Sequence, residues 1–172
     1  SASLVGSEMC IRDRYSIYVS LIKKVIILIK NIIENLKQPL PGKRAHKELA
    51  PYRNEIELDF KNKNPKIAST LLLIYPKDGE TFFCLIERQE YEGTHSNQIS
   101  FPGGKNEIGE SMQETALRET KEEIGVDPIS INIIGKLTQV YVPPSNFLIH
   151  PFVGYCDFTP SFKANDREVQ RI

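Results

Sequence analysis

The sequence GGKNEIGESMQETALRETKEEIGV, residues 103–126, carries the strongest local pattern of the chain. Two glycines open it, and the run from Ser111 to Ile124 predicts a helix. Ser111 can cap the first turn, and Glu114 three residues later completes a capping box. Gly125 is the expected C-terminal glycine, because glycine readily adopts a left-handed conformation. We therefore expect a loop, a capped helix and a second loop in this order.

Three glutamates share one face of the predicted helix. Glu119, Glu122 and Glu123 stand at i, i+3 and i+4, which places their carboxylates within side-chain reach. Without a partner they would repel one another near the negative end of the helix dipole. A solvated acidic face is one interpretation, and a divalent cation such as Mg²⁺ or Mn²⁺ held by the oxygens is the other. The packing side of the same helix is expected to comprise Met112, Thr115, Ala116 and Thr120.

The spacing of these residues resembles the Nudix box, G-x5-E-x7-R-E-U-x-E-E-x-G-U, in which U is an aliphatic residue. Gly104, Glu110 and the run from Arg118 to Val126 match it, with Thr120 at the first U position as the departure. The resemblance implies an α/β fold, the Nudix α/β/α sandwich with a mixed sheet. It also implies hydrolysis of a diphosphate linked to another group, with Mg²⁺ or Mn²⁺ as cofactor.

The same resemblance implies the metal ligands. Glu119 and Glu123 correspond to the principal ligands, and Glu122 to a further ligand or to the general base. The carbonyl of Gly103 corresponds to an extra ligand. Since the general base lies inside the box in some Nudix branches and on a distant loop in others, its identity stays open.

Two further positions of the box concern orientation. Arg118 is expected to orient Glu119 through a salt bridge, and a simple intrahelical ion pair is compatible with that role. Glu110 is expected either to bind metal through water or to pair with Arg118.

Sequence outside the box is similar to the bacterial coenzyme A diphosphatases. The similar segments are Leu85–Arg88, Gly93–Gly104, Leu40–Gly42, Pro143–Phe147 and Pro151–Gly154. This resemblance implies cleavage of CoA or acyl-CoA to 3′,5′-ADP and (acyl-)4′-phosphopantetheine. Because Gln89-Glu90 and Asn97 depart from the usual residues, ADP-ribose, NADH or another nucleoside diphosphate derivative is the alternative substrate. A catalytically inactive Nudix-fold binding module is the alternative from another class.

The substrate phosphates require cations or exposed backbone groups. Arg88 and His95 are candidate substrate-binding residues, with an ordinary surface arginine and a loop hydrogen-bonding histidine as the alternatives. Gly104 is a third candidate, because a glycine lets backbone approach a ligand closely.

The rest of the chain predicts a sheet and an N-terminal helical part. A hairpin is expected from Ile67–Tyr75, a turn at 76–79 and Thr81–Glu87. Helices are expected at Tyr15–Gln38 and Lys43–Leu49. The remaining extended segments are 99–101, one or two strands within Ile129–Val142, and Phe147–Phe158. We expect a non-native leader at 1–14, an N-terminal helical extension at 15–64 and a Nudix domain at 65–172 that is truncated at its C-terminus.

Composition excludes several other classes of protein. The chain has 172 residues with 22 basic and 22 acidic side chains, so nucleic-acid binding through bulk positive charge is not expected. The neutral total is uneven, because residues 15–53 are basic and residues 103–125 acidic. Lysines 23, 24 and 30 interrupt the most apolar stretch, so no stable membrane span is expected. Three cysteines without CxxC spacing argue against a zinc ribbon and favour the reducing cytoplasm. The expected partner is a small nucleotide diphosphate substrate.

Overall fold

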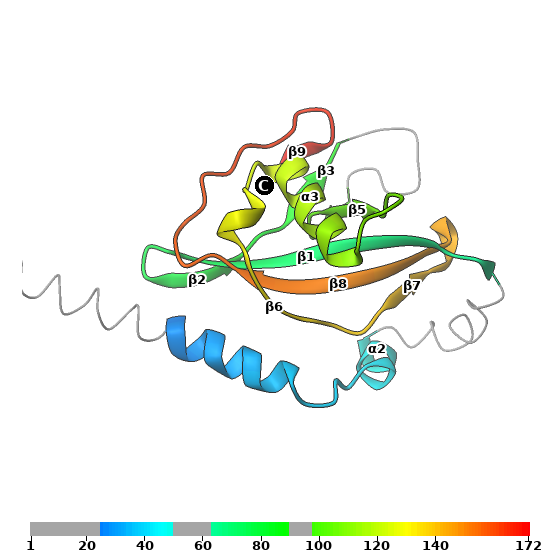
Figure 1. The fold of residues 1–172 in the computed structure, drawn as a ribbon, viewed down its shortest axis with the longest axis horizontal. Helices are drawn as coiled ribbons and strands as arrows, with labels where there is room; N and C mark the ends of the chain where they lie inside the picture. Colours follow the sequence, from blue (N-terminus) through cyan, green and yellow to red (C-terminus); the bar gives the residue numbers. More distant parts are fainter. Residues whose placement is uncertain (1–24, 50–62, 90–97) are drawn as a thin grey trace, which may run out of the picture.

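The computed structural model describes residues 25–49, 63–89 and 98–172, and its centre is a six-stranded mixed sheet (Figure 1). The long strand β1 (Lys66–Lys77) pairs in parallel with β8 (Phe147–Tyr155). All other pairs of this sheet are antiparallel. The other four strands are β2 (Glu80–Phe83), β5 (Gly103–Lys105), β6 (Asn132–Lys136) and β7 (Val140–Val142).

The prediction of a single return strand of the hairpin at Thr81–Glu87 is wrong for the second half of that segment. Strand β2 ends at Phe83, and residues 86–88 form β3 (Ile86–Arg88) in a separate three-stranded sheet. That sheet also contains β4 (Ile99–Ser100) and β9 (Val169–Arg171). The reason is competition for one edge of β1, because β5 pairs with residues 68–70 of β1 and leaves only residues 74–77 for β2.

Helices cover both faces of the large sheet, which confirms the expected sandwich (Figure 1). Helix α3 (Met112–Ile124) packs on one face, over a core that contains Leu71, Leu73 and Ile86. A helix at residues 25–36 packs on the other face, where Ile29 contacts the cluster of Ile74 and Val153. A further helix, α2 (Lys43–Leu49), follows it. The first ten residues of the helix predicted at Tyr15–Gln38 lie outside the described residues.

The caps of α3 agree with the sequence pattern. Ser111 accepts a hydrogen bond from the backbone of Glu114, whose side chain accepts one from the Ser111 backbone, and Gly125 is left-handed with φ 73°. The expected packing side is correct for the three residues Thr115, Ala116 and Thr120. It is wrong for Met112, the first residue of α3, which is exposed because its side chain lines an open pocket with residues of β7 and β8 instead of packing in the core.

Other elements differ from expectation mainly in their ends. The stretch Ile129–Val142 holds the strands β6 and β7, preceded by a short 3₁₀ turn, η3 (Pro128–Ser130). Strand β8 ends at Tyr155, three residues before the expected Phe158. Cys84 and Cys156 are buried free thiols, as expected. None of the helices among the described residues is long and apolar enough to span a membrane. The proposed domain limits stay a prediction.

Candidate active site

The three glutamates of the acidic helix face occupy three different environments. The Glu123 side chain is 1% exposed, the Glu119 side chain 14% and the Glu122 side chain 54%. One edge of this face therefore turns into the core and the other into solvent. The sequence pattern places the residues on one face, but it does not distinguish these depths.

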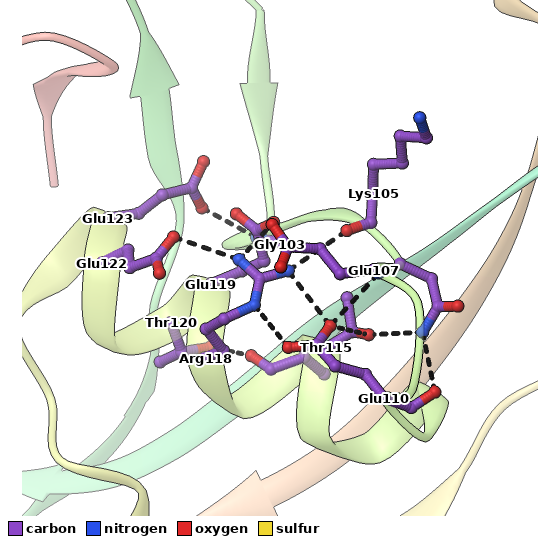
Figure 2. A network of polar contacts seen from close by, with 12 residues as sticks. Gly103, Lys105, Glu107, Glu110, Thr115, Arg118, Glu119, Thr120, Glu122 and Glu123 are labelled. Carbon is purple, nitrogen blue, oxygen red and sulfur yellow. Dashed lines mark hydrogen bonds and ion pairs between the residues drawn. The ribbon is translucent and has the colours of Figure 1, made fainter.

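Arg118 of α3 forms ion pairs with several glutamates of the site and lies at the centre of this network (Figure 2). Its guanidinium donates to Glu110 at 2.6 Å, to Glu119 at 3.0 Å and to Glu122 at 3.1 Å. It also donates to the carbonyl oxygen of Lys105 at 3.2 Å. The expected pairs of Arg118 with Glu119 and with Glu110 are thus present. Because Arg118 cannot move without breaking all four contacts, it ties the glycine loop to α3.

Glu110 is held as a carboxylate on the loop before α3. The hydrogen bond from Arg118 lowers its pKa to about 2, and the hydroxyl of Thr115 donates a second bond at 2.9 Å. Asn106 donates to that hydroxyl oxygen at 2.7 Å. Charge-assisted bonds of this kind fix the loop against the first turn of α3.

Glu123 lies at the bottom of the site. Its carboxylate accepts a hydrogen bond from the backbone N–H of Gly103 at 2.8 Å and pairs with Arg88 at 3.3 Å (Figure 2 shows the Gly103 bond). Burial nevertheless raises its pKa to about 7, and the neighbouring carboxylate of Glu119 adds to the rise. Burial also raises the pKa of Glu119. For both side chains, burial thus outweighs the ion pairs and hydrogen bonds that would lower the pKa.

The two glycines of the loop make room for this pair. A Cβ atom on Gly103 would overlap the carbonyl oxygen of Ser69 on β1 and lie 2.6 Å from the Cα of Thr70. A Cβ atom on Gly104 would overlap the carboxylate of Glu119. Gly103 therefore allows the backbone to approach β1, and Gly104 allows the Glu119 carboxylate to lie against the loop.

A cleft of about 460 Å³ opens above the carboxylates. Glu119, Glu123, Gly103, Gly104 and Arg88 line it, as do four residues that the sequence patterns did not mark as site residues: Gln89, Lys105, Arg167 and Glu168. The negative charge of Glu168 contributes to the raised pKa of both Glu119 and Glu123. No local pattern marks Arg167 and Glu168, since long-range backbone contacts bring them to the cleft. His95 lies outside the described residues.

The donor set of the site fits a divalent cation in its chemistry. Glu119 and Glu123 both line the cleft and offer carboxylate oxygens, which are the ligands that hard divalent cations prefer. Within the described residues, however, no three His, Cys, Asp or Glu side chains converge closely enough to form a ready cage. In this structure Arg118 pairs with Glu119 and Glu122, and Arg88 pairs with Glu123.

Comparison with known families agrees with the box geometry. The family model of the NUDIX domain matches residues 65–172. The chain belongs to the Nudix family. Its match includes the glycine loop, helix α3 and the segment that carries Glu168.

Two relatives of this Nudix chain are themselves named as Nudix hydrolases. Nudix hydrolase 3 of Caenorhabditis elegans is 36% identical over 107 residues, which cover 60% of this chain and 45% of that protein. The uncharacterized Nudix hydrolase NudL of Yersinia enterocolitica is 33% identical over 91 residues, which cover 52% of this chain and 46% of that protein. The match spans less than half the length of either relative.

Solved structures share the Nudix fold at low sequence identity. A C. elegans Ap4A hydrolase binary complex aligns with a TM-score of 0.53 and 19% identity, over 60% of this chain and 75% of that chain. The NUDIX domain of Shewanella oneidensis NrtR complexed with ADP ribose aligns with a TM-score of 0.52 and 16% identity, over 70% of this chain and 79% of that chain. At these identities the likeness concerns the fold alone.

Proposed function

We propose that this Nudix chain hydrolyses a diphosphate linkage with the help of Mg²⁺ or Mn²⁺. The observation that carries the proposal is the pair of Glu123, which is buried, and Glu119, which is partly buried; both lie beside the glycine loop and line the cleft. A buried carboxylate with a pKa near 7 is costly for folding, and such perturbed groups cluster at functional sites. A cation would bring the compensating charge that Arg88 and the Gly103 amide leave incomplete.

In this proposal Glu119 and Glu123 hold the metal, with Glu122 and the Gly103 carbonyl as further ligands. When bound, the metal supplies charge neutralisation for the diphosphate and acidifies a bound water. Arg118 orients Glu119 and Glu122 through its ion pairs. Arg88 and the Gly103 amide orient Glu123, because each of them donates to a different oxygen of its carboxylate.

The reaction adds water across one P–O bond of the diphosphate. The water oxygen bonds to one phosphorus while the bridging oxygen leaves with the other phosphate, and a carboxylate accepts the proton of the water. Glu122 can accept this proton from the box, and Glu168 can accept it from the segment before β9. We favour Glu168, because it lines the cleft beside Glu119 and Glu123 but lies outside the box that would hold the metal.

CoA or acyl-CoA is the substrate that we propose, with 3′,5′-ADP and (acyl-)4′-phosphopantetheine as the products. The support is the similarity of the segments before and after the box to coenzyme A diphosphatases. Arg88 lines the cleft, as a substrate-binding residue must. The buried thiols of Cys84 and Cys156 are compatible with the reducing cytoplasm as the place where the chain acts.

Product analysis tests the substrate assignment. With Mg²⁺ present, CoA is expected to yield 3′,5′-ADP with a kcat/KM at least about tenfold above that for ADP-ribose or NADH, a preference worth about 1.4 kcal/mol. Chromatography with mass detection identifies the products, and a Glu80→Gln variant on the exposed strand β2 is the matched control that retains activity. Cleavage of ADP-ribose or NADH without 3′,5′-ADP from CoA would replace CoA by the alternative substrate. Binding of these compounds without cleavage would instead identify an inactive binding module.

A further inference from the structure

Two basic side chains at the cleft have no acidic partner among the described residues. Arg88 and Arg118 are engaged by the glutamates of the box. Arg167 and Lys105, in contrast, form no ion pair with any carboxylate in the part of the chain that the structure describes, although both line the same cleft as Glu119. Figure 2 shows the Lys105 side chain extending away from Arg118, while only its carbonyl oxygen joins the network.

Arg167 is held in place by its backbone. Its N–H donates to the side chain of Asn165 at 3.2 Å, and the Asn165 N–H donates to the carbonyl of Glu123 at 3.0 Å. On the other side, Gln89 of the β3 end donates to the carbonyls of residues 166 and 168 at 2.9 and 3.0 Å. Val169, which follows, is 1% exposed and belongs to the core. The turn at 165–169 is thus fixed to both α3 and β3, so it presents Arg167 at a defined point of the cleft.

The charges of the cleft indicate what Arg167, which has no ion pair with the described residues, could bind there. The carboxylates of Glu119, Glu123 and Glu168 face the cleft, yet Arg167 pairs with none of them. If those carboxylates hold cations, the ligand that completes the site is an anion with several oxygens. A guanidinium binds phosphate oxygens through two parallel N–H bonds, and an ammonium adds a point charge.

We propose that Arg167, assisted by Lys105, binds the phosphate oxygens of the diphosphate substrate and thereby sets the preference of the site for diphosphates. This inference rests on the proposed function and deepens it. Arg167 touches the substrate rather than the metal ligands, so its removal weakens substrate binding while the carboxylate network stays intact. Binding of the phosphates should weaken as the salt concentration rises, because the charged side chains of Arg167 and Lys105 are solvent-exposed.

The test measures binding of imidodiphosphate, a diphosphate analogue with a bridging nitrogen, in the presence of Mg²⁺ by calorimetry. Arg167→Gln is expected to raise its Kd about tenfold, Arg167→Lys to have an intermediate effect, and Lys105→Gln to raise the Kd about threefold. Arg44→Gln on α2, an exposed arginine away from the cleft, is the matched control and is expected to bind like the wild type. Thermal unfolding verifies that each variant is folded.

Hydrolysis kinetics provide the second readout. Arg167→Gln is expected to raise KM about tenfold and to change kcat less than about threefold, since it removes binding that ground and transition states share. Wild-type affinity of Arg167→Gln and Arg167→Lys for imidodiphosphate would overturn the inference, as would an equal loss in Arg44→Gln. Failure of the proposed function is a separate result: the wild-type chain would cleave no diphosphate, whether or not imidodiphosphate binding depends on Arg167.

Discussion

A Glu123→Gln variant of the metal-free protein is expected to be more stable than the wild-type protein at pH 8, by about 1–3 kcal/mol. The reason is that Glu123 is 1% exposed and its pKa is raised to about 7, above the ordinary value of 4.5. A glutamine keeps the shape and can still accept the hydrogen bond from Gly103, but it does not bury a charge.

The sign of the pH dependence follows from proton binding. Between pH 4.5 and about 7 the folded protein holds a proton on Glu123 that the unfolded chain has already released. The contribution of Glu123 to folding therefore becomes less favourable as the pH rises through this range. Urea denaturation at pH 5 and pH 8 should show the decline in the wild type and a smaller one in Glu123→Gln.

The same substitution is expected to reduce diphosphate hydrolysis about a thousandfold, which corresponds to about 4 kcal/mol of transition-state stabilisation. It is also expected to remove the rise in unfolding temperature that Mg²⁺ produces in the wild type, because a ligand of the folded state stabilises that state. Glu80→Gln on exposed β2 is the control and should change neither property. A Glu123→Gln variant that is less stable at pH 8 and fully active would contradict both the burial and the metal-ligand assignment.

Gly103→Ala is expected to destabilise the fold by about 3 kcal/mol or more, the upper range for overpacking. The added Cβ would meet the backbone of Ser69 and Thr70, and neither atom can move without separating β5 from β1. Urea denaturation measures the loss, and it should appear at every pH because no titration is involved.

Gly104→Ala is the matched variant one residue away. The atoms nearest to its Cβ would be those of the Glu119 carboxylate, which is the end of a flexible side chain. Stability should change by less than about 1 kcal/mol, while hydrolysis should fall about 10- to 100-fold because Glu119 is displaced. Equal loss of stability in the two variants would contradict the assignment of Gly103 to backbone packing against β1 and of Gly104 to the placement of Glu119.

Helix α3 could be predicted from the sequence because its signals are local. Ser111, Glu114 and Gly125 satisfy the ends of the helix through neighbours in the chain, so the residues themselves determine the caps. The split of Thr81–Glu87 into β2 and β3 could not be predicted in this way. It depends on β5 occupying the same edge of β1, a contact between segments far apart in sequence.

In the candidate site, too, local features could be predicted from the sequence, whereas features that depend on contacts between distant segments could not. The shared face of Glu119, Glu122 and Glu123 follows from helix geometry. The resemblance allows Glu110 to pair with Arg118, as it does in the structure, but it also allows Glu110 to bind metal through water. The different depths of the three glutamates depend on which side of α3 the sheet covers. Residues 165–169 reach the cleft only because Gln89 and the end of α3 hold that turn, and neither contact has a sequence signature.

The most direct measurement of the central claim is the rate of CoA hydrolysis as Mg²⁺ is titrated, for the wild-type chain and for Glu119→Gln. The wild-type rate is expected to rise from the background in EDTA to a plateau with added Mg²⁺. In Glu119→Gln, the plateau is expected to be at least about a hundredfold lower, equivalent to about 2.7 kcal/mol. A wild-type rate that is the same in EDTA as in Mg²⁺, or a Glu119→Gln variant that reaches the wild-type plateau, would contradict a metal-dependent hydrolase built on the carboxylates of α3.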